Sequence, residues 1–225
     1  FSDTHANVEA LDAVIDAYKS ERIDRYVCIG DTVGYGASPN QVLAWLRSLP
    51  SDTVVVRGNH DRVCAGLDSA DYFNRYAREA AVWTLDQLHE RNLAYLKSLP
   101  EGPLALGDEV AICHGSSFDE DAYIFSVYDA NQAFDSLPHR VTFFGHTHVP
   151  TLFSQQVEDG QQTLRARLLT GSRTVIDLEP KTRYLINPGS VGQPRDREHP
   201  DHFASCSGAS AFVGCRPLHR TGDGQ

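Results

Sequence analysis

Five of the ten histidines lie in short polar motifs that directly follow apolar, strand-like runs: His5, His60, His114, His146 and His148. The GHTH motif at 145–148 is the most specific, because alternate residues of an extended chain place both imidazoles on one side. Neutral imidazole is a favoured ligand of Zn, Fe, Mn and Ni. A single His-x-His is more often an ordinary surface feature, but the motifs taken together predict a metal site.

Two aspartates and an asparagine accompany these histidines. Asp3 precedes His5 by two positions, a spacing that sends both side chains to the same side of an extended chain. Asp31 stands on the glycine-rich loop GDTVGYG, where the small residues would let the backbone approach a carboxylate that bridges two cations. Asn59 lies in the motif GNHD. Each of these motifs alone is compatible with a turn or a helix cap.

The strands that precede the motifs fix where these side chains stand. The β-branched residues at 53–56 predict a buried strand, and the apolar residues at 26–29 predict a second one. Asp3, Asp31 and Asn59 follow one another at intervals of 28 positions, close to the roughly 30 residues of one βαβ unit. We therefore expect them side by side at the carboxyl end of a parallel sheet, where open α/β sheets bind ligands.

The rest of the chain alternates helices with strands and then becomes antiparallel β. Helical periodicity and capping signals predict helices at 7–20, 39–49, 71–89, 92–98 and 129–137. Apolar runs bounded by turn residues predict further strands at 104–106, 110–113, 141–144, 151–153, 164–169, 174–178 and 184–186. With 225 residues and no Pro/Gly/Ser-rich linker, the chain is expected to form one α/β domain.

Composition argues against two classes of partner. The formal net charge is −10 and no basic patch is visible, which disfavours binding to a nucleic-acid duplex. No apolar run approaches the ~20 residues that span a bilayer, so no membrane partner is expected. The five cysteines include no CxxC pair, and Cys28 and Cys113 lie in apolar runs, as in proteins of a reducing compartment. We therefore expect a cytoplasmic protein.

The motifs also occur in a specific order: DTH, GDTVGYG, GNHD, HGS and GHTH, followed by NPGSVGQPRD at 187–196. This order resembles that of the calcineurin-like metallophosphoesterases. The GDTVGYG and NPGSVGQPRD motifs are similar to those of their small single-domain bacterial and archaeal phosphodiesterase branch. The resemblance implies an α/β fold, a four-layer α/β/β/α sandwich of two mixed β-sheets flanked by helices, with a binuclear metal centre at the strand ends.

The resemblance implies a role for each motif residue. Asp31 would bridge two divalent transition-metal ions, Mn, Fe, Zn or Ni, with Mn favoured. Two sets of three residues would hold one ion each: Asp3, His5 and His148, then Asn59, His114 and His146. His60 would bind no metal and would contact the phosphoryl oxygen or protonate the leaving group. Asp61 is expected to cap the next helix or to orient His60.

Two divalent cations about 3.5–4 Å apart lower the pKa of a shared water, bind phosphoryl oxygens and stabilise an in-line displacement. The sequence therefore predicts an enzyme that hydrolyses phosphodiester, or phosphomonoester, bonds of small molecules through a metal-bridging hydroxide. Tyr35 and Ser116 lie on loops that should rim the site, and they are candidate substrate contacts. Protein phosphatases of the superfamily carry Asp-Arg-Gly after the Gly-Asp motif, whereas this chain has VGYG at 33–36, which disfavours that activity.

Other interpretations stay open. A catalytically silent scaffold of the same fold would bind partners, although such proteins typically lose metal ligands and this chain has the full set. The metallophosphoesterase domain is expected over 1–192, with its first strand truncated and an irregular tail over 193–225 that is disordered or frameshifted. A chain that lacks its first and last strands could also fold poorly. The sequence indicates neither the substrate nor the oligomeric state.

Overall fold

The computed structural model describes residues 1–19, 21–170, 173–195, 202–207 and 210–215. The helices in these ranges are Val8–Tyr18 (α1), Pro39–Leu46 (α2), Asn59–Cys64 (α3), Arg75–Gln87 (α4), Glu90–Ser98 (α5) and Val127–Ser136 (α6). The strands are Val27–Cys28 (β1), Val54–Val55 (β2), Leu104–Ala105 (β3), Val110–Ile112 (β4), Val141–Phe143 (β5), Thr151–Glu158 (β6), Gln161–Leu168 (β7), Arg173–Asp177 (β8), Thr182–Asn187 (β9), His202–Ser207 (β10) and Ser210–Cys215 (β11). Among the described residues, no helix is long and apolar enough to cross a membrane.

The amino-terminal part of the chain builds a small parallel sheet. β1 and β2 pair in parallel. The start of the chain continues this ladder, because the Phe1 amino group donates to Val27 O and the Ile29 N–H donates to Phe1 O, both at 3.0 Å. The three segments that precede the DTH, GD and GNHD motifs therefore run side by side, as predicted from their spacing.

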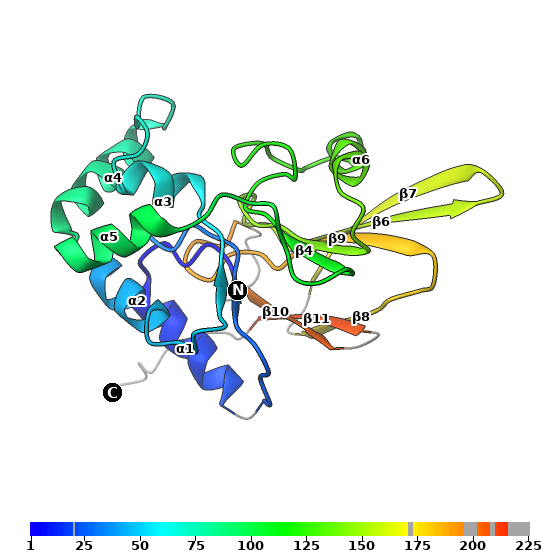
Figure 1. The fold of residues 1–225 in the computed structure, drawn as a ribbon, viewed down its shortest axis with the longest axis horizontal. Helices are drawn as coiled ribbons and strands as arrows, with labels where there is room; N and C mark the ends of the chain where they lie inside the picture. The colour runs from blue at the N-terminus through cyan, green and yellow to red at the C-terminus, as the bar shows by residue number, and fades with distance from the viewer. Residues whose placement is uncertain (20, 171–172, 196–201, 208–209, 216–225) are drawn as a thin grey trace, which may run out of the picture.

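A six-stranded sheet has the order β3-β4-β5-β9-β6-β7. β4, β5 and β9 are parallel to one another, whereas β3, β6 and β7 pair antiparallel with their neighbours. The β6–β7 hairpin extends from this sheet on the side away from α1 to α5 (Figure 1). Because β4 and β5 are parallel neighbours, the HGS and GHTH motifs that follow them emerge at the same edge of the sheet.

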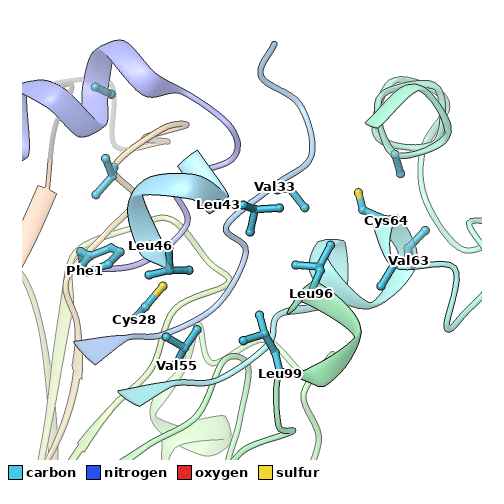
Figure 2. Packing of buried hydrophobic residues seen from close by; sticks show 14 of the residues in the cluster. Phe1, Cys28, Val33, Leu43, Leu46, Val55, Val63, Cys64, Leu96 and Leu99 are labelled. Carbon is cyan, nitrogen blue, oxygen red and sulfur yellow. The ribbon is translucent and has the colours of Figure 1, made fainter. Parts of the chain in front are cut away.

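Three apolar clusters define the layers of the fold. In the first, residues of helices α1 to α5 pack against one face of β1 and β2, with Leu43, Leu46 and Leu96 near Cys28 and Val55 (Figure 2). The second cluster joins the small parallel sheet, the six-stranded sheet and β8, which contributes Ile176. The third packs α6 against the outer face of the six-stranded sheet. Helices therefore cover the small parallel sheet and the six-stranded sheet, and β8, β10 and β11 form a third sheet. The predicted α/β class is confirmed, and the four-layer sandwich of two mixed sheets stays a prediction.

Side chains point alternately to the two faces of a strand, so one strand contributes residues to two apolar clusters. Cys28 packs among the helices, whereas its neighbour Ile29 packs between the sheets. In the six-stranded sheet, Phe143 faces the interior between the sheets and Phe144 packs with the α6 cluster. Successive residues of a strand point to opposite faces, so the continuous apolar runs in the sequence mark strands that are covered on both sides.

The carboxyl-terminal segment, for which the sequence predicts an irregular tail over 193–225, contains two strands among the described residues. β10 and β11 pair antiparallel with each other, and β11 also pairs with β8, which places Ala211 opposite Ile176. The one apolar cluster that the sequence shows in this segment, residues 211–213, falls within β11. Pairing with a distant strand supplies backbone hydrogen bonds that local periodicity does not reveal. The domain boundary at residue 192 stays a prediction.

Phe134 on α6 is enclosed by the third cluster, with the Arg183 guanidinium 5.2 Å from its ring centroid. Phe134→Ala should lower the free energy of unfolding by about 3–5 kcal/mol, because the neighbouring side chains fill the resulting cavity only in part. Chemical denaturation followed by circular dichroism measures this loss. Tyr76→Ala, which removes an exposed ring from α4, should change the free energy by less than about 0.5 kcal/mol. Equal losses in both variants would contradict the packing of α6.

Candidate metal centre

The residues predicted as ligands stand where the strands end in unusual backbone. Five of them have positive φ angles between 47° and 64°: Asp3, His5, Asp31, His146 and His148. Left-handed backbone is uncommon for residues other than glycine, and it persists where the surrounding contacts enforce it. Backbone strain is therefore concentrated in the motifs whose residue types suggest metal chemistry.

One group of potential ligand atoms lies within 4.8 Å of one another and comprises Asp3, His5, Asp31 and His148, all of them buried. The Nε2 atoms of His5 and His148 are 3.1 Å apart. His148 Nε2 lies 3.2 Å from Asp3 Oδ1, and His5 Nε2 lies 3.6 Å from Asp31 Oδ2. Two carboxylates and two imidazoles thus converge from both sheets.

A second group comprises Asp31, His114 and His146, again with ligand atoms within 4.8 Å of one another. His114 Nε2 lies 3.3 Å from Asp31 Oδ2 and 3.2 Å from Asn59 Oδ1, which adds an amide oxygen to this group. Asp31 is common to both groups. The structure therefore brings together all seven residues predicted as ligands, while their binding of metal stays a prediction.

Asp3 and Asp31 each have one carboxylate oxygen that accepts no hydrogen bond from the described residues. Asp3 Oδ2 accepts hydrogen bonds from Ser2 Oγ and from the His146 N–H. Asp31 Oδ1 accepts one from the His60 N–H at 2.9 Å. Asp3 Oδ1 and Asp31 Oδ2, the oxygens nearest the imidazoles, accept none. A buried anionic oxygen without a partner is destabilising, and a divalent cation beside it would offset this, so the residues fit metal ions.

Backbone carbonyl groups orient the imidazoles. Three Nδ1 atoms lie within hydrogen-bond distance of a carbonyl oxygen: His5 at 3.1 Å from Val33, His114 at 2.8 Å from Ile29 and His148 at 2.6 Å from Gln193. An Nδ1–H that donates to a carbonyl leaves the Nε2 lone pair free for a metal. His146 has the reverse arrangement, since its Nε2 lies 3.1 Å from Asp121 O and its Nδ1 remains available.

Burial and neighbouring charges set the protonation states of these groups. Burial opposes protonation of His114, but Asp31 raises its pKa to about 10, so this imidazole is charged in the metal-free site and has to lose its proton when a cation binds. Burial lowers the pKa of His5 and lowers the pKa of His146 to about 3, so both imidazoles stay neutral near pH 7. Burial opposes ionisation of Asp3, but the adjacent His148 brings its pKa down to about 2. Burial opposes ionisation of Asp31 as well, and the charge of His114 holds its pKa well below the usual range. The carboxylates are therefore ionised.

His60 lies beside both groups and belongs to neither. It is the second residue of α3, and its N–H is the one that binds Asp31. Its ring centroid lies 4.5 Å from that of Tyr35, 4.5 Å from that of Phe73 and 5.0 Å from that of His5. Its Nδ1 is buried without a hydrogen-bond partner in the described structure. No sequence signal points to Phe73, because this residue lies outside every motif.

Asp61 caps α3, which is one of the two roles predicted for it. Its Oδ2 accepts the Gly58 N–H at 3.0 Å. Its Oδ1 accepts the N–H and the hydroxyl group of Thr32 at 2.8 and 2.7 Å. These bonds connect Asp61 to the loop that carries Asp31 rather than to the ring of His60. Asp61 therefore fixes the Asp31 loop against the helix that begins with Asn59.

The two predicted substrate contacts differ in their surroundings. Tyr35 is partly buried, its ring centroid lies 4.9 Å from that of His5, and Arg195 lies near its hydroxyl group. Ser116 instead directs its hydroxyl group into its own loop, where it donates to Asp119 O at 3.0 Å and accepts the Asp119 N–H at 3.1 Å. Tyr35 lies beside His5 of the first candidate metal group, whereas the Ser116 hydroxyl group stabilises a turn. Substrate binding by either residue stays a prediction.

Asn187, at the end of β9, holds the loop that carries two of the histidines. Its Nδ2 donates to Gly145 O at 2.7 Å and to Thr147 Oγ1 at 2.9 Å. Its Oδ1 accepts the Gly189 N–H at 2.7 Å. The NPGSVGQPRD motif contains Asn187, but nothing in a lone asparagine after a strand indicates which loop it will bind. The side chain is fully buried and therefore sets the position of the GHTH motif.

Comparison with known proteins identifies the family. Residues 1–207 match the model of the calcineurin-like phosphoesterase superfamily domain. The chain belongs to this superfamily. It is 38% identical over 200 residues to the uncharacterized protein MJ0912 of Methanocaldococcus jannaschii, a match that covers 87% of this chain and 76% of that protein. The crystal structure of a metallophosphoesterase from Sphaerobacter thermophilus is 34% identical, with a TM-score of 0.78, and the match covers 96% of this chain and 85% of that chain.

The predicted family is thereby confirmed. The superfamily consists of phosphoesterases that use divalent metal ions, and the two groups that share Asp31 provide candidate ligands for such ions in this chain. The mixed six-stranded sheet and its helices agree with the metallophosphoesterase fold of the Sphaerobacter structure.

Asn187→Ala should weaken Mn²⁺ binding by about 10- to 100-fold, because the loop with His146 and His148 loses the bonds that orient it. Titration calorimetry on the metal-free protein measures the affinity. Asn131→Ala on α6 removes an amide side chain that is hydrogen-bonded to Asp135 and Gln162 rather than to a motif loop, and it should leave the affinity unchanged. Unaltered Mn²⁺ binding in a folded Asn187→Ala variant would show that the loop holds its position without this side chain.

Proposed function

We propose that this chain is a binuclear metal-dependent phosphoesterase that hydrolyses phosphodiester, or phosphomonoester, bonds of small molecules. The observation that carries the proposal is the position of Asp31, which belongs to both candidate metal groups. A single carboxylate can bridge two cations. Paired cations are the arrangement with which many phosphatases and nucleases act on phosphoryl groups.

The proposed ligand sets divide the cluster in two. Asp3, His5 and His148 would hold the first ion, and Asn59, His114 and His146 the second, with Asp31 between them. When bound, such ions lower the pKa of a water and polarise phosphoryl oxygens. The carboxylates offset the added positive charge, and the carbonyl-bound imidazoles keep their lone pairs on the site. Nitrogen and oxygen donors of this kind suit Mn, Fe, Zn or Ni, and we favour Mn.

His60 would act on the substrate. Its backbone is held by Asp31, and its ring is confined by Tyr35 and Phe73, so the imidazole is oriented before a substrate arrives. In this position it would donate a hydrogen bond to a phosphoryl oxygen or a proton to the leaving oxygen. Tyr35 would contact the substrate from the same side.

The proposed substrate is a small phosphorylated molecule, since the net charge of −10 disfavours the polyanionic backbone of a duplex. Bis-p-nitrophenyl phosphate, p-nitrophenyl phosphate, cyclic nucleotides and dinucleoside polyphosphates, each with Mn²⁺, Fe²⁺, Zn²⁺ or Ni²⁺, form a suitable activity screen. Hydrolysis that requires added metal supports the proposal. A protein that binds no metal and is inert with Mn²⁺ would be a scaffold of the same fold.

Asp31→Ala should reduce both metal content and turnover to background, because it removes the carboxylate common to the two groups. Elemental analysis of the purified variant and hydrolysis of bis-p-nitrophenyl phosphate measure the two effects. Asp135→Ala, at an exposed aspartate on α6, serves as the control and should behave like the wild type. Retention of two ions in Asp31→Ala would refute a bridging role.

His60→Ala should leave the metal content unchanged and lower kcat by about 10²- to 10⁴-fold, the range for loss of a general acid or base. The same two assays apply, with kcat determined at saturating Mn²⁺. Loss of the ions from His60→Ala would mean that His60 is a ligand, and the role given to it here would be wrong.

A further inference from the structure

The loop before α6 carries two aromatic side chains out of the surface. Ile124 is 3% exposed and packs in the third apolar cluster, whereas Tyr123 and Phe125 on either side of it are 45% and 62% exposed. Alternate residues of an extended chain point to opposite sides, so the buried isoleucine directs both rings outward. The Phe125 N–H donates to Asp129 Oδ2 at 3.1 Å, which ties this loop to the amino-terminal cap of α6.

These two rings form a stack that begins at a candidate metal ligand. The ring centroids of Tyr123 and His146 are 3.9 Å apart with an interplanar angle of 22°. The centroids of Tyr123 and Phe125 are 5.1 Å apart with an angle of 11°. Nearly parallel rings thus lead from the proposed second metal site to the solvent-exposed face of Phe125.

A hollow of about 230 Å³ adjoins the outer ring of this stack. Phe125 lines it on one side, with Val149 and Thr151 following the GHTH motif and with Arg167 and Leu168 at the end of β7. The hollow is too small to enclose a whole drug-sized ligand but is of a size for one planar group. Thr151 and Leu168 are register partners in β6 and β7, so both side chains stand on the face of the sheet that carries the hollow, whereas Arg167 pairs with Leu152 and points to the other face.

We propose that Phe125, supported by Tyr123, and the adjoining hollow bind the nucleobase of a nucleotide whose phosphate lies at the metal centre. This proposal rests on the proposed phosphoesterase function and names the substrate class for the same site. A base presents a flat π-face to an exposed aromatic ring and a polar edge to the hydroxyl group of Thr151. Stacking on an aromatic side chain typically contributes about 1–3 kcal/mol per base. The substrate class is therefore a nucleotide rather than an aliphatic phosphate ester.

Titration calorimetry of the Mn²⁺-loaded protein, performed in the cold with intact ligand verified afterwards, tests this inference. The probes are adenosine 5′-monophosphate, ribose 5-phosphate and inorganic phosphate, because the first two differ only by the base. The nucleotide should bind about 5- to 150-fold more tightly than ribose 5-phosphate. Phe125→Ala should abolish this difference and leave the affinity for inorganic phosphate unchanged, whereas Phe125→Tyr should retain it.

Tyr76→Ala is the matched control, since it removes a ring that is 77% exposed on α4, outside the stack. It should bind all three probes as the wild type does. Equal affinities for adenosine 5′-monophosphate and ribose 5-phosphate, with inorganic phosphate still bound, would overturn the base site alone. So would an unchanged preference in Phe125→Ala. If the metal-loaded protein bound none of the probes and hydrolysed no ester, both the base site and the phosphoesterase function would fall.

Discussion

The site depends on one buried carboxylate that two sets of donors share. Asp31 uses Oδ1 to hold the His60 N–H, which leaves Oδ2 facing His5 and His114 without a hydrogen bond. This arrangement requires close backbone approach, because a Cβ at Gly58 would collide with the Asp31 carboxylate. The capping of α3 and the left-handed turns at the strand ends serve to hold this one group in place.

Two sheets supply the ligands, and their packing sets the distances between donors. The small parallel sheet delivers the DTH, GD and GNHD motifs, and the six-stranded sheet delivers the HGS and GHTH motifs. The segment after β9 joins the two, because the Val191 N–H donates to Ser2 O at 3.0 Å and the Gly192 N–H to Asp3 O at 2.9 Å. Displacement of one sheet against the other would separate Asp3 from His148, so the interior apolar cluster is also a determinant of the site.

Local patterns in the sequence were sufficient to predict most of the elements and the convergence of the motifs, but not β10 and β11. The equal intervals between Asp3, Asp31 and Asn59 indicated that the segments before them are parallel neighbours. Apolar runs such as 141–144 indicated strands that are covered on both faces. Contacts between distant segments were not predictable in this way. Asn187 donates hydrogen bonds to a loop 40 residues away, the ring of Phe73 packs on that of His60, and β11 pairs with β8, although no local periodicity marks these partners.

The proposal that Asp31 bridges two metal ions is tested most directly by anomalous diffraction at the manganese edge from crystals of the Mn²⁺-loaded protein. Two anomalous peaks are expected, one beside His5 and His148 and one beside His114 and His146, with Asp31 in contact with both ions. A single peak, or two peaks of which Asp31 contacts only one, would contradict the proposal.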